Sequence, residues 1–191
     1  MVMDMIEIKR FVLGELRSNC YVLYADGHAL VVDPGDDPTP VLRFILENNL
    51  SVDAIYITHG HRDHVGGVKA FTMVHKTIVY APLKDKEWMD DTPINRLGYT
   101  IPVDIWVQDG DVIEALHRSF AVFETPGHSE GSTVLYHDHI LFSGDTLFFQ
   151  NIGRTDIPRA DSRTLYFSIK KIYERFPDDT TCYPGHGRET T

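Results

Sequence analysis

The 191-residue sequence has few cysteines, a deficit of basic residues and no long hydrophobic run. Its two cysteines, Cys20 and Cys182, each stand alone, which excludes a disulfide scaffold and predicts a reducing cytoplasm as the location. The longest apolar stretches reach five or six residues, far from the ~20 that a membrane-spanning helix needs. The first ten residues alternate in character and include Asp4 and Glu7, which argues against a secretory signal.

Basic residues are outnumbered, because 18 Lys and Arg oppose 28 Asp and Glu, a net charge of −10. A protein that binds phosphate backbones needs a basic face, and the closest approach to one is Lys170, Lys171 and Arg175. We therefore expect neither nucleic acid nor an anionic membrane as a partner. A small anionic substrate stays compatible with the charge, because a bound metal ion inverts the local field.

The composition, with 42% hydrophobic and 24% charged residues, is that of a globular protein, and its length predicts one domain over residues 1–191. Alternating or short apolar runs predict ten strands, at residues 6–13, 19–25, 28–32, 54–58, 105–107, 112–116, 120–125, 133–137, 140–143 and 180–183. Helical spacing of apolar residues predicts helices at 40–49, 65–74 and 162–176, and residues 82–102 are expected to form a short helix and loops. This order predicts an α/β sandwich, with two sheets inside and helices outside.

Side chains that bind metal ions crowd the segment after the strand predicted at 54–58. His59, His61, Asp63 and His64 occupy four of six consecutive positions. Imidazole and carboxylate groups are the ligands that Zn²⁺, Mn²⁺ and Fe²⁺ prefer. In an extended backbone His59 and His61 point toward one position, and a turn of the chain would direct Asp63 and His64 to an adjacent one. The alternative is a polar loop that begins a helix with Asp63 as its cap, which suits a single histidine better than this set.

Three further candidates follow later predicted strands. They are His128, Asp145 and His186, and each comes directly after a glycine. Any one of them alone is a weak signal, because a lone histidine in a loop usually has no special role. Together with the earlier segment they place seven ligand-type residues in loops after strands, where open sheets build their sites.

This pattern resembles the metallo-β-lactamase-fold hydrolase superfamily. The resemblance is carried by HGHRDH at 59–64, by Gly-His at 127–128, Gly-Asp at 144–145 and Gly-His at 185–186, and by the Asp33-Pro34-Gly35 turn. It implies a four-layer αβ/βα fold with a dinuclear site between the two sheets. The implied ligands of one ion are His59, His61 and His128, those of the other are Asp63, His64 and His186, and Asp145 would bridge the two.

The resemblance also implies a chemistry. Two divalent ions, zinc, iron or manganese, would hold a hydroxide between them, which attacks a carbonyl carbon at neutral pH. Asp63 is the expected catalytic residue, because it could orient the attacking water as well as bind metal. No serine or cysteine nucleophile is needed, so Cys20 and Cys182 are interpreted as core residues.

Residues 144–159 resemble the small glyoxalase II-like branch, which implies hydrolysis of S-lactoylglutathione or a related thioester or ester. Asp145 argues against a true β-lactamase, where cysteine is typical at that position. Larger glyoxalase II enzymes carry a helical C-terminal region that contacts glutathione, and this chain stops at Thr191, so a missing or short tail is expected and glutathione recognition stays open. The oligomeric state is open too.

Substrate binding has a candidate in Arg154, with Arg159 and Arg188 as further cations for an anionic substrate. The alternative is that these arginines form surface salt bridges around Asp156 and Asp161.

Two other functions are compatible with the same sequence features. Residues 153–156, GRTD, also resemble persulfide dioxygenases, in which a single Fe²⁺ would be held by His59, His128 and Asp145. The third possibility is a non-catalytic metal-binding module that keeps the fold.

The remaining histidines are interpreted as structural or exposed; they are His28, His75, His117, His137 and His139. Trp88, Met89 and Tyr99 are interpreted as packing residues, with the wall of a substrate cleft as the alternative.

Overall fold

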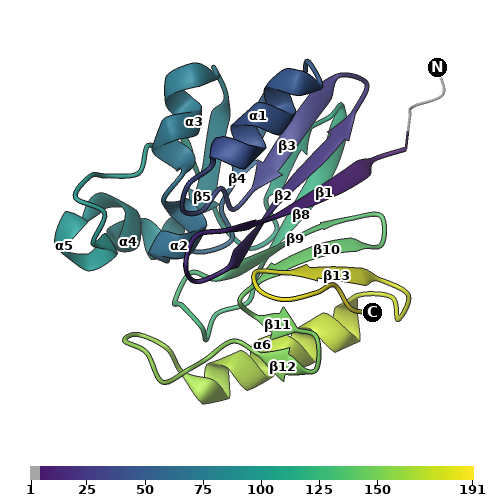
Figure 1. Ribbon diagram of the computed structural model, residues 1–191. Coiled ribbons are helices and arrows are strands. Elements are labelled where there is room, and N and C mark those ends of the chain that lie inside the picture. The colour runs from purple at the N-terminus through teal and green to yellow at the C-terminus, as the bar shows by residue number, and fades with distance from the viewer. Residues whose placement is uncertain (1–4) are drawn as a thin grey trace.

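The computed structural model describes residues 5–191, and their elements lie in four layers (Figure 1). Residues 1–4, part of the segment that argues against a secretory signal, lie outside this range. The first sheet has the order β1 (Glu7–Leu13), β2 (Ser18–Ala25), β3 (His28–Val32), β4 (Ser51–Tyr56), β5 (Ile78–Pro82) and β6 (Ile105–Val107). The second has the order β13 (Thr181–Pro184), β10 (Ile140–Gly144), β9 (Thr133–His137), β8 (Arg118–Glu124) and β7 (Val112–Ala115).

Helices form the two outer layers. In Figure 1, α1 and α3 lie above the first sheet and α6 lies below the second, beside the small hairpin of β11 and β12. Shorter helices α2, η1, α4 and α5 extend from one end of the first sheet. The bounds are α1 (Thr39–Glu47), α2 (Arg62–Val65), α3 (Val68–Val74), η1 (Leu83–Asp85), α4 (Lys86–Asp90), α5 (Thr92–Asn95), β11 (Leu147–Phe148), β12 (Asn151–Ile152) and α6 (Ser162–Arg175).

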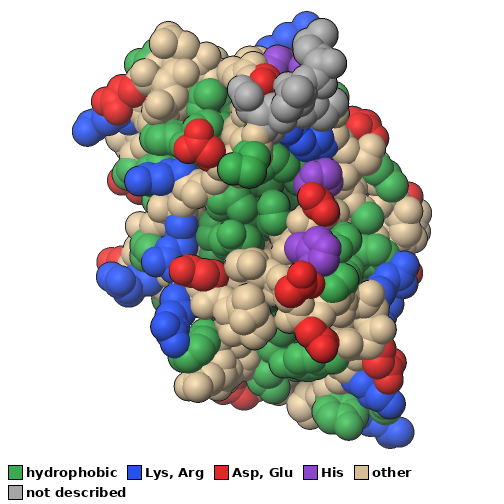
Figure 2. Space-filling model, turned by 90° about the vertical axis from the view of Figure 1, so that its right-hand side faces the viewer, with side chains coloured by type: hydrophobic (Ala, Val, Ile, Leu, Met, Phe, Trp, Pro, Cys, Tyr) green, Lys and Arg blue, Asp and Glu red, His purple; other side chains and the backbone are tan. Residues whose placement is uncertain are grey.

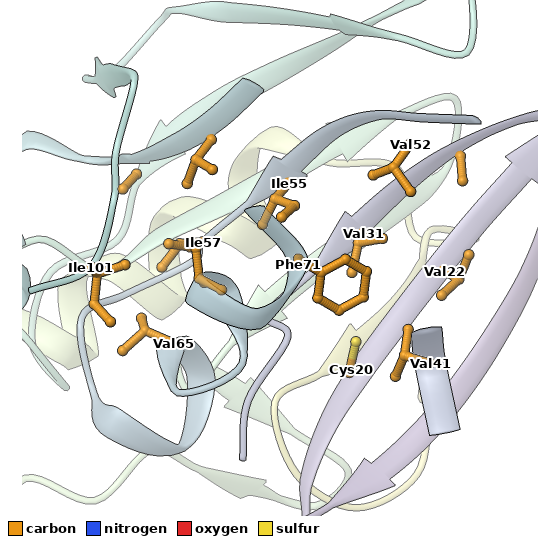
Figure 3. Packing of buried hydrophobic residues seen from close by; sticks show 14 of the residues in the cluster. Cys20, Val22, Val31, Val41, Val52, Ile55, Ile57, Val65, Phe71 and Ile101 are labelled. Carbon is orange, nitrogen blue, oxygen red and sulfur yellow. The ribbon is translucent and has the colours of Figure 1, made fainter. Parts of the chain in front are cut away.

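Alternation along β3 explains why the first sheet is covered on both faces. Ala29 and Val31 belong to the cluster under α1 and α3, whereas Leu30 and Val32 belong to the cluster between the sheets. Successive side chains of a strand point to opposite faces, so one apolar run supplies two cores. Figure 3 shows the outer cluster, in which Val41 of α1 and Phe71 of α3 face side chains of the sheet.

The second sheet alternates in the same way. Phe120 and Val122 of β8 pack between the sheets, whereas Phe123 of the same strand packs with Ile172 of α6. Three hydrophobic clusters therefore separate four layers, which confirms the predicted αβ/βα architecture.

Strand direction decides where the loops gather. β3, β4, β5 and β6 run parallel to one another, and in the second sheet β10 runs parallel to β13. β8 and β10 are both antiparallel to β9, so they run the same way as each other. The carboxyl ends of the parallel strands in each sheet thus share an edge, as in other open sheets that carry a site there.

The structure differs from the predicted elements at several points. The helix expected at 65–74 is two helices separated by Gly66 and Gly67, and the strand expected at 54–58 begins earlier, at Ser51, and ends at Tyr56. β5 and the hairpin of β11 and β12 were not predicted.

Across residues 5–191 no helix combines the length and hydrophobicity that crossing a bilayer requires. Figure 2 shows the side of the molecule that lies to the right in Figure 1, with hydrophobic side chains in the middle and acidic and basic ones interspersed around them.

Candidate metal centre

All seven predicted ligand residues meet at one end of the sandwich. His59, His61, Asp63 and His64 follow β4 and begin α2. His128, Asp145 and His186 follow β8, β10 and β13 of the second sheet. The site therefore lies across the boundary between the sheets, where the ends of their strands converge.

One group of three histidines, which we call the first ligand set, consists of His59, His61 and His128. Each presents one ring nitrogen, and these nitrogens all lie within 4.8 Å of one another. His61 Nδ1 is 2.9 Å from His128 Nε2. The three rings are nearly perpendicular to one another, which lets their nitrogens face a common point.

The second ligand set consists of Asp63, His64 and His186, whose ligand atoms also lie within 4.8 Å of one another. Asp63 Oδ2 is 3.4 Å from His64 Nε2 and 3.3 Å from His186 Nε2. Tetrahedral ligands bound at about 2.0–2.1 Å are separated by about 3.3–3.5 Å, so these distances suit atoms that share a cation.

Asp145 lies between the two sets. Its Oδ2 is 3.4 Å from His128 Nε2 and 3.4 Å from His186 Nε2, and its Oδ1 is 3.5 Å from His64 Nε2. A glycine is required beside it, because a Cβ at Gly185 would overlap the Asp145 carboxylate. The Asp145 carboxylate thus lies within 3.5 Å of histidine nitrogens of both ligand sets, and its bridging of two ions stays a prediction.

Hydrogen bonds fix which ring nitrogen carries the proton. His64 Nδ1 donates to Asp33 Oδ2 at 2.9 Å, and His128 Nδ1 donates to the Arg154 carbonyl at 2.9 Å. Thr58 Oγ1 donates to Asp33 Oδ2, which leaves it free to accept from His59 Nδ1 at 3.1 Å. In all three rings Nε2 consequently faces the centre of the site.

Asp33 supports the site by accepting hydrogen bonds from His64 and Thr58, a role that the sequence did not reveal. It also accepts from the Thr58 backbone N–H at 2.7 Å and is 2% exposed. The only signal for it was the Asp33-Pro34-Gly35 turn after a predicted strand, because its partners are distant in the sequence.

The Asp85 carboxylate, at the end of η1, is a second residue that the sequence reasoning missed. It is fully buried and accepts from the backbone N–H groups of Gly60 and Gly131 and from the Ser129 hydroxyl. No motif marks it, since it lies in the segment whose structure was hardest to predict.

Charges in the site perturb the histidines in opposite directions. Burial lowers the pKa of His59 well below its ordinary value, and burial and His128 lower the pKa of His61 to about 4. Burial opposes the charge of His64 and His186 as well, but nearby carboxylates outweigh it. Asp145 and Asp63 raise the pKa of His64 well above its ordinary value and that of His186 to about 9. The pKa of Asp63 is lowered, because His64 and His186 outweigh its burial.

Three buried atoms test whether the site suits a metal ion. His59 Nε2, His64 Nε2 and Asp145 Oδ1 have no hydrogen-bond partner although they are shielded from water. Buried polar atoms are normally paired, so unpartnered atoms of these residue types suit the binding of a cation. The His and Asp groups of this site are thus able to bind metal, and they are the donors that borderline divalent ions prefer.

A cavity of about 820 Å³ opens onto the site. Trp88 lines it and packs edge-on against His61, so the cleft-wall alternative holds for this residue, whereas Met89 is fully buried. Tyr99 packs against the core cluster and donates to the Gly66 carbonyl, in keeping with its interpretation as a packing residue.

Four arginines line the same cavity: Arg62, Arg96, Arg154 and Arg159. Arg154 is bound through two hydrogen bonds to Asp156, and Arg159 pairs with Glu87, so both take part in surface salt bridges. Within residues 5–191 Arg62 and Arg96 have no ion-pair partner. Arg188 lies over the Phe149 ring instead of lining the cavity.

The family model of the metallo-beta-lactamase superfamily matches residues 13–186, which contain the whole site. This chain belongs to that superfamily. Within the superfamily the chain is a metallo-hydrolase.

Named relatives agree with this assignment. The chain is 31% identical over 192 residues to "Probable metallo-hydrolase YqgX" of Bacillus subtilis, covering 95% of this chain and 90% of that protein. It is 30% identical to "Hydroxyacylglutathione hydrolase GloC" of Haemophilus influenzae, covering 92% and 88%. It is 37% identical to a "Hydroxyacylglutathione hydrolase" of Citrobacter koseri. That match covers 84% of this chain but only 58% of the longer relative.

Two solved structures show the same fold over nearly the whole chain. One, of BLEG-1 B3 metallo-beta-lactamase, has a TM-score of 0.89 and 34% identity, with 96% of this chain and 93% of that chain covered. The other, TTHA1623 in a di-iron-bound form, has a TM-score of 0.82 and 32% identity, with 96% and 94% covered.

Proposed function

We propose that this protein hydrolyses a thioester, S-lactoylglutathione or a related compound, with two divalent metal ions held by the seven residues described above. The observation that carries the proposal is the pair of ligand sets joined at Asp145, on the wall of a cavity large enough for a small molecule. Similarity to two proteins named hydroxyacylglutathione hydrolase favours a thioester among the substrates of the superfamily.

Metal ions bound there would lower the pKa of a water molecule and polarise the carbonyl group of the substrate. The Asp63 side chain is 14% exposed, so its carboxylate reaches the cavity and can accept a hydrogen bond from the attacking water. The thiolate that leaves departs readily and needs no strong acid, and attack by water makes a serine or cysteine nucleophile unnecessary. Cys20 and Cys182 are buried and unpaired, as packing residues are.

The substrate proposed for this cavity carries negative charge at a distance from its reacting carbonyl. Arg62 and Arg96 present guanidinium groups that form no ion pair with any residue from 5 to 191, and Arg154 can contribute if it exchanges Asp156 for a substrate carboxylate. Trp88 and Ile94 supply apolar surface to the same cavity.

The decisive experiment measures thioester hydrolysis by protein loaded with Zn²⁺, Fe²⁺ or Mn²⁺. Wild type is compared with Asp145→Ala and with Asp53→Ala, whose carboxylate accepts from the Leu116 N–H far from the site. We expect Asp145→Ala to lower kcat/KM by at least the 10–100-fold that changes around a metal site cause, and Asp53→Ala to leave it unchanged. Equal rates for wild type and Asp145→Ala would overturn the proposal.

A β-lactam and glutathione persulfide belong in the same assay. The β-lactam is included because one solved relative is named a B3 metallo-beta-lactamase. Oxygen uptake with the persulfide and one iron per chain would instead support the dioxygenase, with His59, His128 and Asp145 as ligands. Turnover of no ester, thioester, β-lactam or persulfide by metal-loaded protein would support the non-catalytic module.

The proposal places the enzyme in the cytoplasm, acting on a small molecule and on neither nucleic acid nor membrane. Its support is the pair of free, buried cysteines, which a reducing compartment preserves, and the acidic net charge of −10.

A further inference from the structure

We propose that Asp85 is a positioning residue for the first ligand set alone, so that it sets the affinity of one metal position independently of the other. The inference rests on the metal-binding role of the site proposed above, but not on a thioester as the substrate.

Asp85 joins the two chain segments that supply the first ligand set. Its Oδ2 accepts from the Gly60 N–H at 2.8 Å, and Gly60 lies between His59 and His61. The same oxygen accepts from Ser129 Oγ at 2.7 Å, and Oδ1 accepts from the Gly131 N–H at 2.7 Å. One carboxylate therefore ties the loop after β4 to the loop after β8, which carries His128.

The packing of Asp85 against Gly60 and Gly131 is tight and shielded from solvent. Asp85 is fully buried, and a Cβ at Gly60 or at Gly131 would collide with η1 or α4. Both positions must therefore be glycine for their backbones to approach this carboxylate. A shift of Asp85 would consequently move the loops after β4 and β8, which hold the ligands. Burial raises the pKa of Asp85, although the bonds from Ser129 and Gly60 counteract it.

The second ligand set depends on a different carboxylate. Asp33 accepts from His64 Nδ1 and from Thr58, and it makes no contact with the Gly60, Ser129 or Gly131 groups that Asp85 holds. Asp33 thus supports the second set directly through His64, and it reaches the first set only through the Thr58 hydroxyl that contacts His59. Asp85 contacts the groups beside His59, His61 and His128 and none of the second-set side chains.

Replacing one Asp85 oxygen by an amide group breaks this arrangement with little change of volume. In Asp85→Asn the amide NH2 can only donate, so it faces either the Gly131 N–H or the Gly60 N–H and cannot accept from it. That backbone must move, and His59, His61 or His128 moves with it.

The experiment isolates each metal position in a variant background. His186→Ala leaves the first ligand set intact, and His61→Ala leaves the second set intact. Asp85→Asn is introduced into both, and Zn²⁺ affinity is measured by competition with a chromophoric chelator, together with the Co²⁺ absorption spectrum. Asp53→Asn is the matched control, because it also removes a carboxylate that accepts a backbone N–H.

We expect Asp85→Asn to weaken Zn²⁺ about 10–100-fold in the His186→Ala background, and less than about threefold in the His61→Ala background. The Co²⁺ spectrum should change only in the first background, and Asp53→Asn should change neither affinity. Equal effects in both backgrounds, or none in either, would overturn the inference.

Ser129→Ala is the second variant, in case Asp85→Asn does not fold. It removes a single donor to Asp85, and we expect a smaller loss of Zn²⁺ affinity confined to the His186→Ala background. Unchanged affinity in that background would overturn the inference. A wild type that binds two ions but hydrolyses no thioester would refute the proposed substrate and leave the role of Asp85 standing.

Discussion

At the scale of single residues, the site is a set of rings whose protons are assigned by their neighbours. The Nδ1–H groups of three rings donate hydrogen bonds: that of His64 to Asp33, that of His59 to Thr58, and that of His128 to the Arg154 carbonyl. Nε2 of each ring then faces the site, so a cation meets rings that are already oriented and loses little affinity to their reorganisation.

The raised pKa of His186, about 9, predicts that metal binding releases protons. A raised pKa means that the ring of the metal-free protein holds its proton below about pH 9, and an incoming ion must displace it. Apparent affinity should therefore rise with pH up to about 9, by up to tenfold per unit for each displaced proton. Calorimetry in buffers of different ionisation enthalpy measures the protons released.

The control for this measurement is to repeat it at a pH above the pKa of His186. Proton release on Zn²⁺ binding should shrink between pH 7 and pH 9.5, as His186 loses its proton before metal arrives. Release that is absent, or constant across that range, would contradict the assignment.

The sequence predicts the seven ligand-type residues because they follow strands and form a recognisable series. It does not reveal Asp33 or Asp85 as supports, since each acts through contacts made 25 or more positions away, such as those to Thr58 and Gly131. Arg154 shows the same limit, because its carbonyl bonds His128 while its guanidinium bonds Asp156.

At the scale of elements, α6 begins next to the site. Asp161 caps it by accepting from the Thr164 N–H at 2.7 Å, and the Asp161 N–H donates to the Gly127 carbonyl, beside His128. A Cβ at Gly127 would collide with Leu165 of the helix, so the ligand loop and α6 lie in direct contact.

Asp161→Ala should lower the free energy of unfolding by about 1 kcal/mol, because the first turn of α6 loses its cap. Asp161→Asn keeps an acceptor and should stay within a few tenths of a kcal/mol of wild type. Denaturant unfolding monitored by circular dichroism measures both. An Ala variant as stable as the Asn variant would show that the cap contributes nothing.

Periodicity predicted the long elements well, because β3 and α6 each bury a clear set of apolar residues. It failed where backbone and tertiary contacts decide. Gly66 and Gly67 divide the helix expected at 65–74, and a Cβ at Gly67 would overlap the carbonyl groups of the turn at Pro34 and Gly35. The hairpin of β11 and β12 has two-residue strands, too short for any period to show.

At the scale of the whole molecule, the two sheets contribute unequal shares of one site. Residues 59–64 come from the first sheet, whereas His128, Asp145 and His186 come from the second. An ion held by ligands from both sheets would bind the folded chain and not the unfolded one, so it must stabilise the fold.

Removal of metal by a chelator should therefore lower Tm, and Tm should rise with the concentration of added Zn²⁺. The expected gain is about 2.7 kcal/mol when free ion is 100 times its Kd. Asp145→Ala should show a smaller dependence, because it loses a ligand shared by both sets. Differential scanning calorimetry measures Tm. A wild-type Tm that changes with neither chelator nor Zn²⁺ would refute the prediction that metal binding stabilises the fold.

The hydrophobic cluster between the sheets has a consequence for the spacing of the site. Tyr56, Phe120 and Phe142 fill this layer, and each is at most 1% exposed. Because the layer separates the strands that end at the site, its thickness acts as a spacer between the two halves of the coordination shell. Side-chain volume deep in the sandwich thus sets how far apart the two sheets hold the strands that lead into the site.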